Sequence, residues 1–114
     1  ETEYEMQALT MFRLMKAFQN VLLRVDKEKN KVVHNIVQPP YTIEGEKMLL
    51  RDLVKDGSEV TFEKVFEGVE NRVHAIFTFL SMLELIQEQF LMIVVGEGYN
   101  NFWLRLKRED EKEL

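Results

Sequence analysis

The sequence predicts a mainly α-helical fold that ends in a small β-hairpin. Apolar residues between positions 4 and 25 are spaced alternately by four and three, which indicates one face of a long helix. Residues 73–86 are apolar almost throughout, as in a buried helix. Two strand-like runs, 90–95 and 101–106, flank a connector that contains Gly96 and Gly98, as a hairpin turn of this length requires.

The first helix is expected to run from residue 2 to about residue 25, uninterrupted by glycine or proline. Its apolar seam consists of Tyr4, Ala8, Met11, Met15, Phe18, Leu22 and Val25. One interpretation is that this face packs on the rest of the same domain, as amphipathic helices usually do. The other is that part of it, at Met11, Met15 and Phe18, pairs with a helix of a partner or of a second copy. Residues 26–31 are charged and are expected to form a solvated turn.

The segment after this turn predicts a short strand and a second helix. Residues 32–37 contain four β-branched side chains, and the prolines that follow, Pro39 and Pro40, end the strand. Thr42 is suited to cap a helix that runs to about residue 54. Gly57 then favours the left-handed conformation at which helices stop.

Two further helices and the hairpin complete the expected domain. Thr61 is a predicted N-cap for a short helix that stops at Gly68, and Asn71 caps a long helix that reaches about Glu88. A helix-turn-helix followed by a wing is the winged-helix arrangement. We therefore expect a long helix with a charged turn at 1–31, a winged-helix domain with its preceding strand at 32–106, and a charged tail at 107–114 that frays.

The composition argues against several classes of function. Fifteen basic and twenty acidic residues give a net charge of −5, and the absence of cysteine excludes disulfides, thiol catalysis and cysteine-based zinc sites. His34 and His74 have no partner at metal-ligand spacing, so we expect no catalytic residue, no metal site and no cofactor. The longest apolar run has six residues, too few to span a membrane as a helix, and no signal peptide is visible.

The charges also argue against direct sequence-specific binding of DNA. The long helix carries one basic residue, Arg72, beside Glu84 and Glu88, and the wing tip carries Glu97. An acidic surface gains no counterion release on a duplex. A winged-helix DNA-binding transcriptional regulator that dimerises through its first helix stays the alternative function.

The hairpin has more apolar side chains than one buried face requires. Alternation assigns Ile93 and Trp103 to the face opposite Phe102 and Leu104, and Tyr99 lies at the turn. Aromatic residues left over from a core are typical anchors of protein interfaces. The candidate interface residues are therefore Leu91, Ile93, Tyr99 and Trp103 of the hairpin and Met11, Met15 and Phe18 of the first helix. The competing interpretation, that the first helix or strand covers this face within the chain, stays open.

Several stretches resemble the segregation and condensation protein A family, the bacterial kleisins, over the C-terminal half of those proteins. The most specific are Val-Thr-Phe-Glu-Lys-Val-Phe at 60–66 and Thr-Phe-Leu-Ser-Met-Leu-Glu-Leu-Ile at 78–86, supported by Val-His-Asn-Ile-Val at 33–37, Thr-Ile-Glu at 42–44 and Lys-Met at 47–48. The likeness runs from about Leu9 to Leu106. The wing departs from the pattern, because Asn-Phe-Trp-Leu stands at 101–104 where the family often has Phe-Gly-Asp-Ile.

The resemblance implies a non-enzymatic bridging subunit that acts in chromosome condensation and segregation. In such proteins a C-terminal winged helix docks on the ATPase head of an SMC-type protein. A central segment binds an accessory winged-helix subunit of the segregation and condensation protein B type. The resemblance also implies a cytoplasmic, nucleoid-associated protein that contacts no membrane. This chain would lack the N-terminal domain that binds the neck of a second SMC-type protein.

Overall fold

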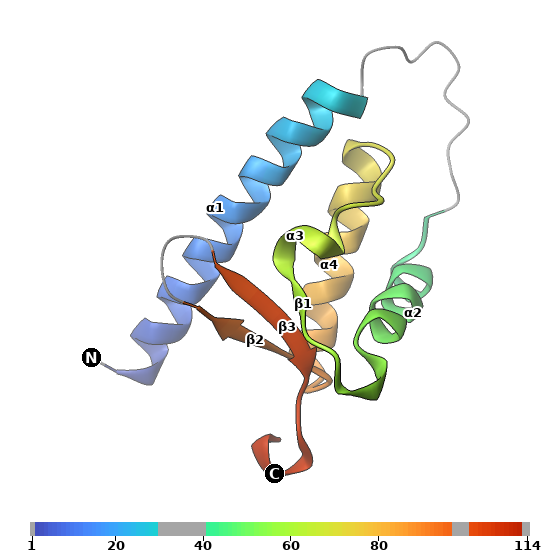
Figure 1. Cartoon of the computed structure of the whole chain (residues 1–114). Helices are drawn as coiled ribbons and strands as arrows, with labels where there is room; N and C mark the ends of the chain where they lie inside the picture. Colours follow the sequence, from blue (N-terminus) through green and yellow to red (C-terminus); the bar gives the residue numbers. More distant parts are fainter. Residues whose placement is uncertain (1, 30–40, 97–100, 113–114) are drawn as a thin grey trace.

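The structure is a computed structural model that describes residues 2–29, 41–96 and 101–112 (Figure 1). The helices are α1 (Glu3–Lys29), α2 (Ile43–Leu53), α3 (Phe62–Val65) and α4 (Arg72–Gln87), with 3₁₀ turns η1 (Lys55–Gly57) and η2 (Glu109–Glu111). The strands are β1 (Val60–Thr61), β2 (Leu91–Val95) and β3 (Phe102–Leu106). The strand predicted at 32–37, the domain boundary expected at residue 31 and the turn residue Tyr99 lie outside the described residues.

The long first helix is confirmed, but it does not end where the sequence predicted. It continues through residues 26–29, which were expected to form a turn. The continuation has two physical causes. Val25 is completely buried, and the Asp26 carboxylate accepts a hydrogen bond of 2.6 Å from the Arg72 guanidinium of α4. This ion pair joins the end of α1 to the start of α4.

The predicted helix starts are confirmed by their caps. The Thr42 hydroxyl accepts from the Gly45 N–H at 2.9 Å and the Thr61 hydroxyl from the Lys64 N–H at 3.0 Å. The Asn71 side chain accepts from the N–H at position 74 at 2.9 Å. Each cap satisfies a backbone donor that a helix leaves unpaired at its first turn. Gly57 has the expected positive φ, at 79°.

The predicted hairpin is confirmed, and a third strand joins it. Strand β1, which the sequence analysis missed, pairs antiparallel with β3, so the strand order is β1-β3-β2. Two residues are too few to show the alternation by which a strand is recognised. The order α2, β1, α3, α4, β2, β3 is the helix-turn-helix with a wing that the sequence predicted.

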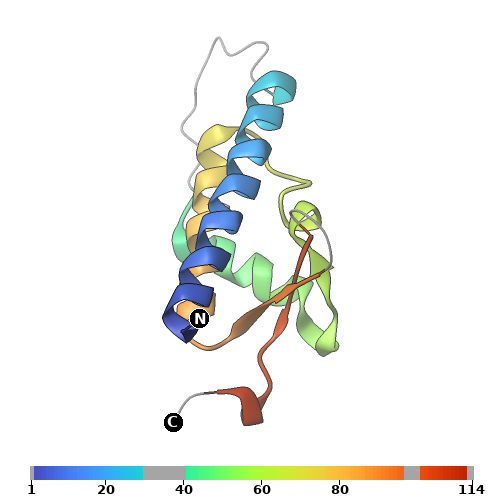
Figure 2. The same cartoon turned by 90° about the vertical axis from the view of Figure 1, so that its left-hand side faces the viewer.

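One hydrophobic core joins α1, α4 and the sheet. The rings of Phe18 in α1 and Phe79 in α4 stack with their centroids 4.2 Å apart. Phe62 and Phe66 continue this aromatic cluster to Phe102 in β3. Figure 1 and Figure 2 both show α1 and α4 side by side, with the sheet at the end of α1 where the chain begins. The fold therefore leaves the first turns of α1 next to the wing.

Helix α2 is held against α4 by a buried lysine. The Lys47 ammonium lies 2.8 Å from Glu84, 2.7 Å from Glu88 and 3.4 Å from Glu44. Its side chain is 4% exposed. The hydrogen bonds to Glu84 and Glu88 raise the pKa of Lys47 above its usual range and outweigh the opposing effect of burial. A buried ammonium requires anionic partners. Here Glu44 of α2 supplies one, and Glu84 and Glu88, in α4 and at its C-terminal end, supply two more.

The described part of the charged tail, residues 107–112, is ordered against β3, in contrast to the fraying that the sequence predicted. Turn η2 lies beside the sheet, and the Arg105 guanidinium of β3 donates two hydrogen bonds, of 2.9 and 2.8 Å, to the Glu111 carboxylate. A bidentate arginine–carboxylate pair is among the stronger side-chain contacts. Composition marked these residues as polar, but the partner Arg105 lies in the preceding strand and becomes apparent only in the fold.

Candidate protein interface

The register of the wing decides which side chains face outward. Leu104 lies directly opposite Ile93, and Trp103 lies opposite Val94 and Thr61. Residues directly opposite in antiparallel strands project from the same face. Ile93 therefore shares the core face with Leu104, so its predicted assignment to the same face as Trp103 is wrong. Alternation tells which residues of one strand share a face. Which face of β2 lies on the same side as which face of β3 depends on the register between the two strands.

Leu91, another predicted interface residue, is also on the core face. It is 2% exposed and belongs to the central hydrophobic cluster. It lies opposite Leu106, whose side chain packs partly against the same cluster. Both sets of alternating residues in β2 are therefore apolar for different reasons. One set, with Leu91 and Ile93, faces the core, and the other, with Met92 and Val94, faces outward.

Trp103 lies on the face that the sequence predicted, away from Phe102 and Leu104. It is half-buried and is absent from the hydrophobic core. Its ring lies against Gly96, where an added Cβ would come within 2.2 Å of ring atom Cζ3. We define the outer sheet face as Thr61, Met92, Val94, Trp103 and Arg105. Trp103 is not part of the core cluster to which α1 contributes, and the first strand of the competing interpretation, at 32–37, lies outside the described residues.

One end of the outer sheet face is closed by charged groups. The Arg105 guanidinium contacts the Met92 sulfur at 3.3 Å, binds Glu111 and lies 4.0 Å from Glu59. The Arg105 hydrogen bonds, with that of the Arg108 N–H, lower the pKa of Glu111 to about 2. The part of this face left for an apolar partner is therefore the end that carries Trp103 and Val94.

The apolar seam of α1 divides into a buried part and an exposed part. Phe18 is 7% exposed and stacks on Phe79, so its expected role as an interface residue is corrected to a core role. Met11 and Met15 are each 43% exposed. The buried residues of α1 are Leu14, Ala17, Phe18, Val21 and Val25. The second half of the seam thus packs within the domain, as the first interpretation predicted. The first half is exposed, and its pairing with another helix stays a prediction.

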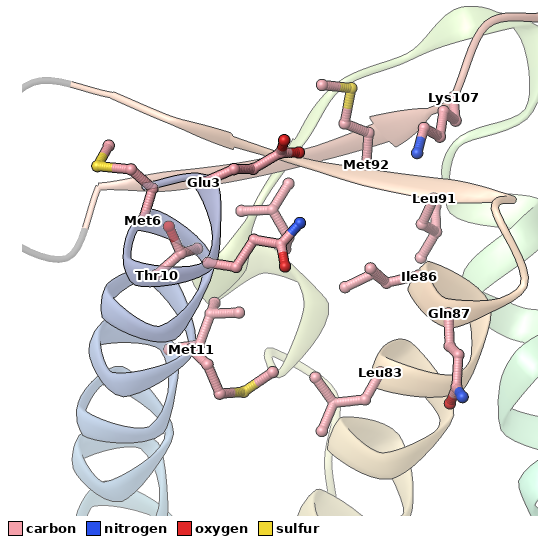
Figure 3. A pocket seen from close by; sticks show the side chains of 13 residues that line it. Glu3, Met6, Thr10, Met11, Leu83, Ile86, Gln87, Leu91, Met92 and Lys107 are labelled. Carbon is pink, nitrogen blue, oxygen red and sulfur yellow. The ribbon is translucent and has the colours of Figure 1, made fainter. Parts of the chain in front are cut away.

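A groove of about 650 Å³ separates the first turns of α1 from α4 and β2. Figure 3 shows Met11 projecting from α1 into this space and Leu83 and Ile86 projecting into it from α4. Ile93 of β2 lines it as well, with Glu3 and Lys107 among its few charged residues. The groove brings Met11 and Ile93, two predicted interface residues from distant parts of the sequence, to one surface.

Helix α4, which is described over its full length, has two large apolar side chains among its exposed residues, together with Arg72, Glu84 and Gln87. Val73 and Leu80 are 45% and 49% exposed. Arg72 is bound to Asp26 of α1. An arginine held by a carboxylate is poorly placed to bind phosphate or a base edge. The helix that would enter the major groove in a DNA-binding winged helix therefore offers exposed apolar side chains and a paired arginine instead.

His74 belongs to a structural cluster at the start of α4. The Glu70 N–H donates to its Nδ1 at 3.1 Å, and its Nε2 lies 3.1 Å from the Glu46 carboxylate. The Tyr41 ring stacks on the imidazole with centroids 4.3 Å apart, and the Tyr41 hydroxyl donates to Glu70. Burial, with Glu70 adding to it, raises the pKa of Tyr41 to about 12. The cluster fastens residue 41 and α2 to α4, whereas His34 lies outside the described residues.

The described part of the chain has neither a cluster of metal-binding side chains nor a membrane-spanning helix. It contains no group of three or more histidine, aspartate or glutamate side chains placed to hold a metal ion. None of its helices is both long and apolar enough to cross a membrane.

The chain is similar to curated proteins named segregation and condensation protein A. It is 26% identical over 103 residues to the proteins of that name from Streptococcus mitis and from Streptococcus pneumoniae strains Hungary19A-6 and 70585. The match covers 90% of this chain and 43% of each relative, so the chain spans less than half of their length. No family model matches the chain. These relatives confirm the resemblance seen in the sequence.

Proposed function

We propose that this chain is part of a non-enzymatic bridging subunit that acts in chromosome condensation and segregation, and that its winged helix docks on the ATPase head of an SMC-type protein. The observation that carries the proposal is the similarity over 90% of the chain to proteins named for segregation and condensation. The exposed apolar side chains of α4 support it, because they suit a protein partner better than a duplex.

The docking surface in this proposal is the open end of the outer sheet face, at Trp103 and Val94. Tryptophan is enriched among the residues that contribute most to protein interfaces, because its ring removes a large apolar area from water. Here the side chain is partly exposed, and its ring lies close to Gly96 and outside the core cluster. A rigid aromatic side chain loses little conformational entropy when a partner covers it.

The proposal includes a second partner, an accessory winged-helix subunit of the segregation and condensation protein B type. It places the assembly in the cytoplasm, on the nucleoid. Co-purification of this chain with an SMC-type head and with the accessory subunit tests both contacts separately.

The decisive variant for head docking is Trp103→Ala. Truncating an interface anchor costs about 2 kcal/mol or more, which corresponds to a roughly 30-fold weaker Kd. The measurement is titration of an SMC-type head with the wild-type chain and the variant. The Tm of the variant should stay close to that of the wild type, since Trp103 is outside the core.

Leu49→Ala is the matched control for head docking, because Leu49 is an exposed apolar residue on α2 and belongs neither to the outer sheet face nor to the outward surface of α4. It should leave head binding unchanged. Unchanged head binding by Trp103→Ala, in a variant that folds, would contradict the assignment of this face.

A further inference from the structure

The first half of α1 carries an apolar surface that nothing in the described structure covers. We call Tyr4, Ala8, Met11, Phe12 and Met15 the outer patch of α1. Tyr4 is 79% exposed, Phe12 58%, and the two methionines 43% each. At about 100° per residue, all five lie within roughly 100° of the helix circumference. Figure 2 shows α1 in front of the other elements.

The size of this surface indicates that it contacts another protein surface. Monomeric soluble proteins rarely expose a contiguous row of large apolar side chains, and such rows mark interfaces. The charges beside the patch indicate what kind of protein surface would complement it. Glu5 and Lys16 both flank it on the side away from the core, three helical turns apart.

We propose that two copies of this chain associate through their outer patches, with the α1 helices antiparallel and the two-fold axis near Met11. In this arrangement Glu5 of one copy lies within about 2 Å, along the helix axis, of Lys16 in the second copy. The two-fold axis repeats the pair, so each dimer has two such pairs. A parallel two-fold arrangement in register would place Glu5 and Lys16 of the two copies on opposite sides of the interface, so no such pair would form.

The sizes of the side chains are also self-complementary in the antiparallel arrangement. Ala8 of each copy faces Met15 of the second copy, and the two-fold axis repeats this contact. A small residue opposite a large one lets helix axes approach to about 8–10 Å. A closed two-fold interface requires one surface that is complementary to itself, and both the charges and the sizes in this patch meet that requirement.

The first test is the mass of the purified chain, measured by light scattering over a concentration series. We expect about twice the monomer mass of 13.6 kDa at high concentration. Met15→Lys should give the monomer, since an ammonium in an apolar interface has no partner. Leu23→Lys is the matched control, because Leu23 is 69% exposed on the same helix but lies beyond the overlap of the two patches. It should leave the dimer intact.

The second test reverses the charges and decides the direction of the helices. Lys16→Glu alone and Glu5→Lys alone should each weaken the dimer roughly tenfold, because two attractive pairs become repulsive. The double variant Glu5→Lys with Lys16→Glu should restore it. A monomeric wild-type chain at every concentration, or a double variant as weak as the single ones, would overturn the proposal. Head binding and Trp103→Ala are independent of these outcomes.

Discussion

At the scale of single residues, ion pairs fasten α2 to α4 and the C-terminal turn η2 to strand β3. Lys47 is buried among glutamates of two helices, and Arg105 binds Glu111 with both of its terminal nitrogens. Each pair links segments that are separated in the sequence. The hydrogen bonds shift the pKa of Lys47 and Arg105 upward and that of Glu111 downward, so the charged forms are favoured in the folded chain.

The Glu111 pair makes a prediction about pH. Its folded-state pKa is lowered from 4.5 to about 2, so ionised Glu111 stabilises the fold fully above its ordinary pKa. This contribution is lost as the pH falls from about 4.5 towards 2. The difference in Tm between wild type and Glu111→Gln should therefore be constant above pH 6 and shrink towards zero near pH 2. Glu109→Gln, at a 90% exposed side chain, should show little difference at any pH.

At the scale of elements, the packing of α1 against α4 determines which side chains of α1 are exposed to solvent. Helix α1 has 27 residues and α4 has 16, about 40 and 24 Å at 1.5 Å per residue. The last turns of α4 still reach the first turns of α1, where the two helices line the groove. Along the seam, Phe18 is buried against Phe79 of α4, whereas Tyr4 is 79% exposed.

The wing makes a prediction about the close contact between Gly96 and Trp103. Gly96→Ala should displace the indole ring, because the new methyl group would overlap it. We expect a Tm lower by several degrees, as for a typical overpacked site, and a shift in fluorescence from Trp103, the single tryptophan. Gly68→Ala is the control, since an added Cβ there has no atom within 4 Å. Equal behaviour of the two variants would contradict the contact.

At the scale of the whole molecule, one core includes the second half of α1 together with the helix-turn-helix and the wing. The aromatic cluster reaches from Phe18 through Phe62 and Phe66 to Phe102. Helix α1 is therefore a structural part of the domain, while its first half extends to the groove and the outer patch.

This arrangement predicts a single cooperative unfolding transition that depends on α1. Phe18→Ala should lower the free energy of unfolding by about 3–5 kcal/mol, as for other buried phenylalanines. Phe12→Ala, at an exposed position on the same helix, should change it by about 0.5 kcal/mol or less in a dilute sample. Denaturant unfolding followed by circular dichroism measures both. Two separate transitions, or equal effects of the two variants, would contradict a shared core.

The sequence by itself determined the elements that depend on local chemistry. Thr42, Thr61 and Asn71 predicted three helix starts because their side chains satisfy backbone donors within three residues. The spacing of apolar residues predicted the first helix, and the glycines of the connector predicted the hairpin. The motifs at 60–66 and 78–86 carried the resemblance that the curated relatives confirm.

The tertiary structure decided what depends on pairing between distant segments. The register of β2 against β3 moved Ile93 to the core face and left Trp103 outside, since a shift of one residue exchanges the two faces of a strand. Strand β1 is defined by its pairing with β3, and the described part of the tail is held in part by the pair between Arg105 and Glu111. The packing of α4 on α1 divided the seam of α1 into a buried and an exposed part. No local pattern contains these partners, because each lies tens of residues away or on the next element.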